Sequence, residues 1–378
     1  MESPSKDHYP VGVFHPNVWG DYFITPASTS SNELLQIQSK IDELKLNLSK
    51  MLKETTNHHQ SLVLIDTMQH LGVAYHFEIE IDEILNIIHR TGFNPSEDMQ
   101  TVALGFRLLR QHGLLASPDV FTKFLDEDGD LLNLGSTQSI EDLLGLYEAS
   151  YFLTPDEKIL EKAAYHARNH LELVVDDLNP YMKEMVSRAL QIPRLKRVER
   201  LEARQFINVY ELQQNRIEML LEFAKLDFQC VQSLHHEELR HLSLINNFPR
   251  EVFDWVTTFP EVTKASSRMG RIVNGLVSDE HEQKEKHVAN VVQCYIRQHG
   301  CTKEVAHEKL KEMVEKLWRV FSQELLRLRN IPLCFIWIII NHARVCNLFY
   351  LNKDEYTNAG EDMKDYVNSV MVENVISF

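Results

Sequence analysis

A helical spacing of apolar residues runs through most of this chain and constrains its fold more than any other feature. Between residues 34 and 51, apolar side chains recur at alternating steps of three and four, which places them on one stripe of an α-helix. The residues of this stripe are Leu34, Ile37, Ile41, Leu44, Leu48 and Met51. The next helical patterns end at Gly72, Gly92 and Gly113, where glycine can adopt the left-handed conformation that ends a helix. We therefore predict an all-α fold of helical hairpins stacked into a bundle or toroid.

The same pattern continues along the rest of the chain. It predicts helices over residues 140–151, 155–175, 201–242 and 305–328. It is interrupted at residues 243–250, where Pro249 disfavours helix in the residue before it. The longest apolar run, residues 333–340, is far shorter than the ~20 residues that a membrane-spanning helix needs. We interpret this run as a buried helix.

Composition and charge narrow the classes of partner. The chain has 378 residues, of which 44% are hydrophobic and 25% charged, the composition of a packed globular protein long enough for two domains. Its formal net charge of -16 makes nucleic acid a poor partner, because a polyanion would be repelled. The densest basic stretch, residues 194–204, is interrupted by Glu199 and Glu202. We interpret that stretch as a solvated helix face.

The cysteines and the first residues predict a cytoplasmic protein. The five cysteines form no CxxC pair and are odd in number, so reduced thiols fit better than a disulfide framework. They are Cys230, Cys294, Cys301, Cys334 and Cys346. The N-terminal sequence MESPSKDHYP contains no apolar core for secretion, and the residues that follow lack the arginines of an organelle transit peptide.

One stretch near residue 280 has the spacing of a metal site. Asn274, Ser278 and Glu282 are four residues apart, so on a helix they project from one side within a narrow arc. Three such oxygen ligands suit Mg²⁺, which accepts few protein oxygens and completes its coordination with water and substrate phosphates. Arg271, about one turn earlier, could donate to the same phosphates. A polar helix face in water explains the spacing equally simply, and the spacing alone favours that reading.

Resemblance to a known family changes this balance. The stretch is similar to the second metal motif of class I terpene synthases, Asn/Asp-Asp-x-x-Ser/Thr-x-x-x-Glu, whose first, fifth and ninth positions bind magnesium. Asn274, Ser278 and Glu282 match those positions. Further segments resemble plant sesquiterpene synthases in the same order along the chain: Phe14-His15-Pro16, LIDTMQHLGVAYHFEIEIDEIL, FRLLRQHG, LEARQF, LLEFAKLDFQCVQSLHHEEL, HVANVVQCYIRQHG and ARVCNLFYLNKDEYTNAG. The chain thus resembles this family over nearly its whole length.

The resemblance implies a domain organisation and a chemistry. Residues 1–23 would be an N-terminal segment, residues 24–213 a helical α/α-toroid-like domain without its own active site, and residues 214–378 a partial metal-binding bundle. It also implies farnesyl diphosphate as substrate, Mg²⁺ or alternatively Mn²⁺ as cofactor, and a monomer. Asn274, Ser278 and Glu282 would hold the metal and Arg271 the diphosphate, while the sequence assigns no catalytic residue.

Two departures from the family pattern are visible. Gly275 stands where the family has an aspartate beside the metal ligands. More importantly, the family's aspartate-rich DDxxD motif is missing: the adjacent pair Asp176 and Asp177 is followed by Pro180 where the last acid should be. The resemblance places an internal deletion near residues 243–252, within the catalytic domain. A chain without that segment would be catalytically impaired, because ionising a prenyl diphosphate requires metals held by two facing helices.

Alternative interpretations remain open at the level of sequence. The chain could be a non-catalytic helical interaction protein that associates through exposed apolar faces. Two Glu-x-x-His pairs, at residues 238–241 and 304–307, match the sequence pattern of a carboxylate-bridged di-iron site. Both lie among charged residues, which is typical of a solvated surface. Glu361, Asp362 and Asp365 have the spacing of a substitute acidic motif near the C-terminus, and residues 126–130 predict an acidic solvated turn.

Overall fold

The structure is a computed structural model that describes residues 31–128, 131, 139–240, 255–282, 290–328, 330–357 and 360–375. Within these ranges it is helical, and the one extended pairing is an isolated bridge between Leu125 and Leu131. The all-α prediction is therefore confirmed. The α-helices of the N-terminal half are α1 (Ser31–Glu54), α2 (His58–His70), α3 (Glu78–Thr91), α4 (Met99–Gln111), α5 (Ile140–Ser150), α6 (Glu161–Val174), α7 (Pro180–Gln191), α8 (Glu199–Glu211) and α9 (Glu218–Arg240).

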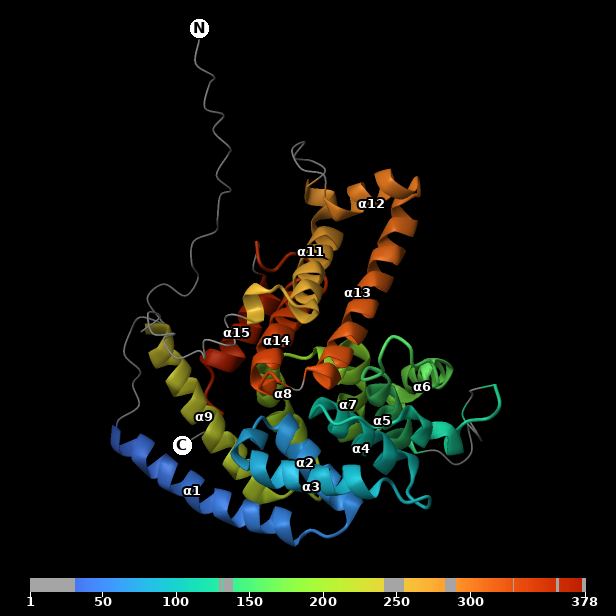
Figure 1. Cartoon of the computed structure of the whole chain (residues 1–378). Coiled ribbons are helices and arrows are strands. Elements are labelled where there is room, and N and C mark those ends of the chain that lie inside the picture. The colour runs from blue at the N-terminus through green and yellow to red at the C-terminus, as the bar shows by residue number, and fades with distance from the viewer. Residues whose placement is uncertain are drawn as a thin grey trace.

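The described part of the C-terminal half is helical as well. Its α-helices are α11 (Glu261–Glu282), α12 (Val291–His299), α13 (Lys303–Arg327), α14 (Leu333–Phe349) and α15 (Glu361–Met371). Short 3-10 helices also connect elements of the N-terminal half: η1 (Ala74–Phe77), η2 (Pro118–Phe124), η3 (Val175–Asp177) and η4 (Arg194–Lys196). Figure 1 shows α11 and α13 projecting together from the rest of the molecule, with α12 at their outer end.

The predicted apolar stripe forms the inner face of α1. Ile37, Ile41, Leu44 and Leu48 are buried, and Leu52 extends the stripe by one more turn. This face packs on α9, which comes almost two hundred residues later in the chain. The periodicity therefore correctly predicted which side of the first helix is buried.

The three predicted helix-ending glycines all adopt positive φ, at +74° for Gly72, +71° for Gly92 and +73° for Gly113. At Gly92 the ψ angle is −179°, so this residue lies outside the left-handed helical region, in a conformation that only glycine reaches easily. At Gly72 a β-carbon would also lie 2.7 Å from the Cβ of Ala203 on α8. Glycine is needed there both for the backbone angle and for close helix packing.

Two predicted helix boundaries are wrong. The 155–175 helix begins only at Glu161, because Thr154 and Glu157 form a turn in which the Glu157 carboxylate accepts the backbone N–H of Thr154 at 2.8 Å. The 201–242 stretch consists of α8 and α9, separated at residues 212–217. The Tyr210 hydroxyl accepts the backbone N–H of Ile217 at 2.9 Å and closes that turn. The predicted interruption at 243–250 lies outside the described residues.

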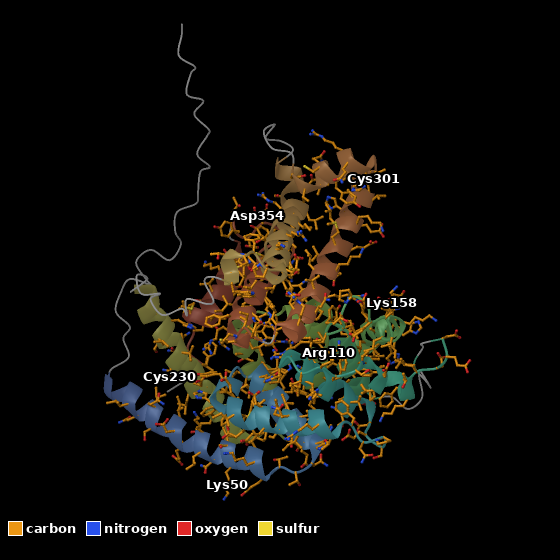
Figure 2. The ribbon with its side chains drawn as sticks, in the orientation of Figure 1. Lys50, Arg110, Lys158, Cys230, Cys301 and Asp354 are labelled. Carbon is orange, nitrogen blue, oxygen red and sulfur yellow. The ribbon has the colours of Figure 1, made fainter. Side chains whose placement is uncertain are left out.

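The prediction of a buried helix over residues 333–340 is wrong in part. This run forms the first half of α14, but only Ile336 and Ile340 of the run are buried, while Ile338 remains 53% exposed and Cys334 is also exposed. No described helix is both long and apolar enough to cross a membrane. All five cysteines are free, as the sequence predicted; Cys301 lies near the outer end of the projection and Cys230 on α9 (Figure 2).

The interpretation of residues 194–204 as a solvated face is also wrong. Arg194, Lys196 and Arg197 are each only 8% exposed. Arg197 donates to the carboxylate of Glu202 at 3.1 Å, and Lys196 donates to Glu315 on α13 at 2.7 Å. These basic residues sit in 3-10 helix η4 and the turn after it, where they meet carboxylates from other helices. Charge in the sequence did not distinguish solvated residues from buried, paired ones.

Buried arginines recur elsewhere in the N-terminal half. Arg110 of α4, labelled in Figure 2, is almost fully buried. It binds Glu157 through two parallel hydrogen bonds of 2.5 and 2.6 Å. Its guanidinium also donates to the backbone carbonyls of Ala116 and Phe152. This arginine therefore fixes two loops against α4, since a buried charge is tolerated only when its hydrogen bonds are satisfied.

Candidate metal-binding site

The predicted metal ligands lie on one continuous helix. Helix α11 spans Glu261–Glu282, and its inner face is formed by Val262, Ala265, Met269, Ile272 and Val273, all buried. That face packs on α12, α13 and α14. Asn274, Ser278 and Glu282 are therefore presented at successive turns of a helix that is held from one side. Arg271 precedes them by about one turn, and its side chain is exposed.

Asn274 and Ser278 have the geometry that their spacing predicts. The Ser278 hydroxyl donates a hydrogen bond of 2.8 Å to the backbone carbonyl of Asn274, which places the two residues at adjacent turns. Ser278 is buried, with 6% of its surface exposed, and Asn274 is half-buried. A serine hydroxyl that donates its proton can still accept through its oxygen, the atom by which it would bind a cation. Two hard oxygen donors on one face fit a magnesium-type ion.

Surroundings of Asn274 link the site to α14. Burial raises the pKa of the Tyr350 phenol, and a hydrogen bond with the side chain of Asn274 acts in the opposite direction. Ser266, two turns earlier on α11, makes a 2.8 Å hydrogen bond with His342 of α14. These contacts fix the orientation of α11 relative to α14. Of the third ligand, Glu282, the structure describes the backbone only.

Sequence reasoning missed the structural role of Asp279, which follows Ser278 directly. The Asp279 side chain is 1% exposed and contacts the starts of α12 and α13. It accepts a 2.8 Å hydrogen bond from Asn290 and forms a 2.7 Å ion pair with Lys303. Asn290 also caps α12 by accepting the N–H of Gln293. A carboxylate next to a metal motif thus holds α12 and α13 against α11. The one sign of this arrangement in the sequence is Asn290, since asparagine is favoured at the position before a helix and so marks the start of α12.

Gly275, the departure from the family motif, faces the start of α12. A β-carbon at this position would lie 2.5 Å from the Cγ1 of Val291, closer than real side chains approach. The glycine therefore permits α12 to contact α11 at this turn. An aspartate would have to displace Val291, so the family's acidic side chain does not fit this packing.

The near-miss motifs do not form metal sites in the described part of the chain. Glu361, Asp362 and Asp365 are exposed on α15, and Glu361 pairs at 3.7 Å with Lys364. Asp126 and Asp128 lie exposed in a turn, as predicted. Across the described ranges, no three His, Cys, Asp or Glu side chains come together as a metal-binding group. Of the di-iron pairs, Glu304 is exposed, whereas residues 238 and 241 fall outside the described side chains.

Comparison with known sequences identifies the family. The sequence profile of the terpene synthase N-terminal domain matches residues 18–190, and that of the terpene synthase family metal binding domain matches residues 221–320. The chain belongs to the terpene synthase family. In this family member the second profile covers most of α9, all of α11 and α12, and most of α13. The candidate ligands therefore lie within the family's metal-binding domain.

Relatives of this terpene synthase match it from end to end. A sesquiterpene synthase from Santalum spicatum is 27% identical over 97% of this chain and 96% of its own, and valencene synthase from Vitis vinifera is 26% identical over 99% and 98%. The alignment with the Santalum protein runs over 540 positions, which exceeds the 378 residues of this chain by 162. At least that many aligned positions have no residue in this chain.

Solved structures show the same fold at lower identity. Isoprene synthase from grey poplar (Populus x canescens) superposes with a TM-score of 0.81 at 20% identity, covering 97% of this chain and 99% of that one. A limonene synthase structure gives 0.85 at 18% identity, covering 96% and 99%. The poplar enzyme was also solved in complex with three Mg²⁺ ions and dimethylallyl-S-thiolodiphosphate. The predicted terpene synthase helical fold is confirmed.

Proposed function

We propose that this chain is a member of the sesquiterpene synthase family and that the polypeptide with the present sequence is catalytically impaired. Farnesyl diphosphate is the substrate of the intact enzyme in this proposal, and Mg²⁺, replaceable by Mn²⁺, is the cofactor. The observation that carries the proposal is the excess of aligned positions over residues, since end-to-end matches combined with a surplus of 162 positions require internal gaps. The relatives described as a sesquiterpene synthase and a valencene synthase support a prenyl diphosphate of the sesquiterpene class as substrate.

The roles of individual residues follow from their positions on α11. Asn274, Ser278 and Glu282 would hold the metal, whose charge offsets that of the departing diphosphate. The exposed Arg271 is free to donate to diphosphate oxygens as a forked, permanently charged donor. Tyr350 and His342 orient this helix from α14 through Asn274 and Ser266. These groups form one side of a site for an anionic substrate.

The missing side explains the proposed impairment. We place the lost segment near residues 243–252, inside the partial catalytic domain of residues 214–378. That domain follows an N-terminal segment of residues 1–23 and an N-terminal domain of residues 24–213. The segment would carry the DDxxD motif on a helix facing α11. Electrostatic stabilisation of a leaving group by fixed charges contributes many kcal/mol to catalysis, so one side alone leaves little activity.

A second candidate function is a non-catalytic helical interaction protein. The observation that favours it is the exposed apolar surface of α14, where Ile338 and Cys334 face solvent. A surface of this kind can mark a contact with another protein. Sedimentation of the purified chain distinguishes a monomer from a self-associating species. Association without turnover would favour this second candidate.

Turnover by the purified chain is the direct test. The chain is incubated with farnesyl diphosphate and Mg²⁺, and the organic extract is analysed by gas chromatography with mass detection. We expect no hydrocarbon product above that of a heat-inactivated sample. A product that disappears on addition of a chelator would overturn the proposed impairment while supporting the assigned substrate and cofactor.

Sequencing the complete transcript distinguishes two origins of the missing segment: the gene has lost the exons that encode it, or the exons are present and are absent only from the sequence as given. A continuous message that encodes a DDxxD-containing insert between Ser243 and Val252 would show that the native enzyme is whole. Its product then provides the positive control for the turnover assay. In that longer protein, replacing Asn274 and Ser278 by alanine is expected to raise the Mg²⁺ concentration needed for turnover, and an unchanged requirement would contradict the metal assignment.

A further inference from the structure

A cavity of about 660 Å³ lies inside the N-terminal half, away from the candidate metal helix. Its walls come from α2, α4, α5, α7 and α8 and from the turn at η4. Part of the lining is apolar, contributed by Val63, Leu104, Leu144, Met182 and Met185. A cavity of this size is in the range that accommodates a small organic molecule.

Charged side chains also line the cavity. Arg107, Arg194 and Arg197 line the cavity together with Asp66 and Glu148. All except Asp66, which is 22% exposed at its side chain, are classed among the buried residues. Charged side chains in this position are expected to be paired, so the hydrogen bonds of each arginine decide whether any charge is left over.

Two of these arginines are well satisfied. Arg107 donates to Asp66 at 2.5 Å and to Gln111 at 3.2 Å. Arg197 donates to the carbonyl of Ile192 and to the carboxylates of Glu202 and Glu148, at 2.7, 3.1 and 3.3 Å. Neither guanidinium has an obvious need for a further partner.

Arg194 is different. Among the described residues, the one contact of its side chain is an ion pair of 3.4 Å between Nη1 and Oε1 of Glu202, too long for a strong hydrogen bond. Glu202 is shared, because the same carboxylate also accepts from Arg188, Arg197 and His70. Arg194 is nevertheless 8% exposed and lines the cavity. Most of its donors therefore lack an acceptor among the described residues.

The charge balance points the same way. Four guanidiniums, of Arg107, Arg188, Arg194 and Arg197, pair with three carboxylates, of Asp66, Glu148 and Glu202. Arg188 and Glu202 belong to this network but lie behind the residues that line the cavity. Burial, followed by attraction to Glu202, leaves the pKa of Arg194 at about 10, so it is charged at neutral pH. Burial also raises the pKa of Glu148, so this carboxylate offsets the positive charge of the arginines less readily than a solvated one would. One further acid, Glu141, lies exposed at the rim, where water screens it.

We propose that this cavity binds a small amphipathic monoanion, with a carboxylate or similar oxyanion head on Arg194 and an alkyl body against Val63, Leu144 and Met185. The surplus of a single positive charge and the unsatisfied fork of Arg194 select a singly charged head. The apolar wall selects an alkyl body. This site is separate from the proposed terpene synthase chemistry and does not depend on it.

Calorimetric titration of the full chain tests the site with four probes: octanoate, octyl phosphate, n-octanol and inorganic phosphate. Octanoate is expected to bind at least tenfold more tightly than n-octanol, because only the carboxylate accepts a charge-assisted hydrogen bond from Arg194. It is also expected to bind more tightly than inorganic phosphate, which lacks the body, and than octyl phosphate, which carries more charge. Equal affinity for octanoate and octanol, or no binding of octanoate, would overturn the proposal. So would tighter binding of either phosphate.

Matched variants locate the binding. Arg194→Met is expected to weaken octanoate at least tenfold and leave octanol unchanged, while the control Arg90→Met, at an exposed position on α3, changes neither. Val63→Phe keeps every arginine but fills the apolar wall, and should reduce binding of octanoate and octanol together. This second variant tests the site even if Arg194→Met does not fold. Octanoate binding that survives Val63→Phe unchanged would place the ligand elsewhere and refute the assignment.

Discussion

Two regions of this molecule, the helices around Glu202 and helix α14, differ in what they bury. In the N-terminal half, charged side chains are buried: Arg110 and Glu202 are both about 2% exposed. In the C-terminal half, α14, the most apolar of the described helices, leaves Ile338 more than half exposed. Burial in this protein is therefore decided by what lies opposite a residue, and only secondarily by the residue's own polarity.

The physical difference is the number of packing layers. Helices α2, α4, α5, α7 and α8 surround one another, so each charge finds partners from several elements. Helix α14 packs on α11 and α13 and reaches the N-terminal half through Arg344, which donates to the carbonyl of Leu195 and the carboxylate of Glu199 at 2.8 Å. Its remaining face has no equivalent layer among the described residues. A helix bundle with one side missing would leave this face exposed.

The largest expected effect is the loss of Glu202. Replacing it by alanine leaves Arg188, Arg194 and Arg197 without their shared carboxylate, and breaking a buried ion pair costs ~3–5 kcal/mol. We expect the free energy of unfolding in urea to fall by that amount. Glu218→Ala, at an exposed ion pair with Arg216, is the control and should change it by less than ~1 kcal/mol. A similar small change for Glu202→Ala would break the contrast between the two regions.

The next effect compares two isoleucines of the same helix. Ile336 is fully buried and Ile338 is exposed, although both belong to the apolar run of α14. Ile336→Ala should lower the free energy of unfolding by ~2–4 kcal/mol, whereas Ile338→Ala should change it by no more than ~0.5 kcal/mol. Equal losses would mean that Ile338 is covered in solution, and would support association through this face.

Acid should destabilise the N-terminal half through His70. Burial, and then the charge of Arg194, lower the pKa of His70 to about 4, against ~6.5 in the unfolded chain. Because the unfolded histidine binds the proton more tightly, stability is lost as pH falls from about 6.5 toward 4, by ~2 kcal/mol at pH 5. His70→Gln should remove this part of the pH dependence, and the exposed-site control His89→Gln should retain it. A His70→Gln profile parallel to that of the parent would contradict the assignment.

The smallest effect concerns Gly275. Alanine there gains ~1 kcal/mol of helix propensity but forces its β-carbon onto Val291, and overpacking costs ~1–3 kcal/mol. We expect a net destabilisation of ~1 kcal/mol, measured by thermal unfolding. The double variant Gly275→Ala with Val291→Ala should recover part of that loss, because removing the Val291 methyl groups makes room for the new β-carbon at position 275. A stabilised single variant would show that α12 yields easily at this turn.

Local features of the sequence predicted much of the fold. The stripe from Ile37 to Leu48, the positive φ of Gly72 and Gly113, and a helix ending near Leu328 all follow from spacing within a few residues. The spacing of Asn274, Ser278 and Glu282 was visible in the sequence, but it was the resemblance to the family that favoured a metal site over a solvated helix face. The roles of these residues remain predictions, since a facing helix is needed to test them.

The sequence by itself determined that this protein is helical, which faces of its helices are apolar, and that residues 274–282 resemble a metal motif of the terpene synthase family. Only the tertiary structure decided which charges are buried: the run at 194–197 looks solvated until Glu202, Glu148 and Glu315 arrive from other helices. The reason is that helix periodicity is a local property, whereas the desolvation of a charge depends on partners far away in the chain. His70 and Glu202, 2.6 Å apart in space, are separated by 132 residues in the sequence.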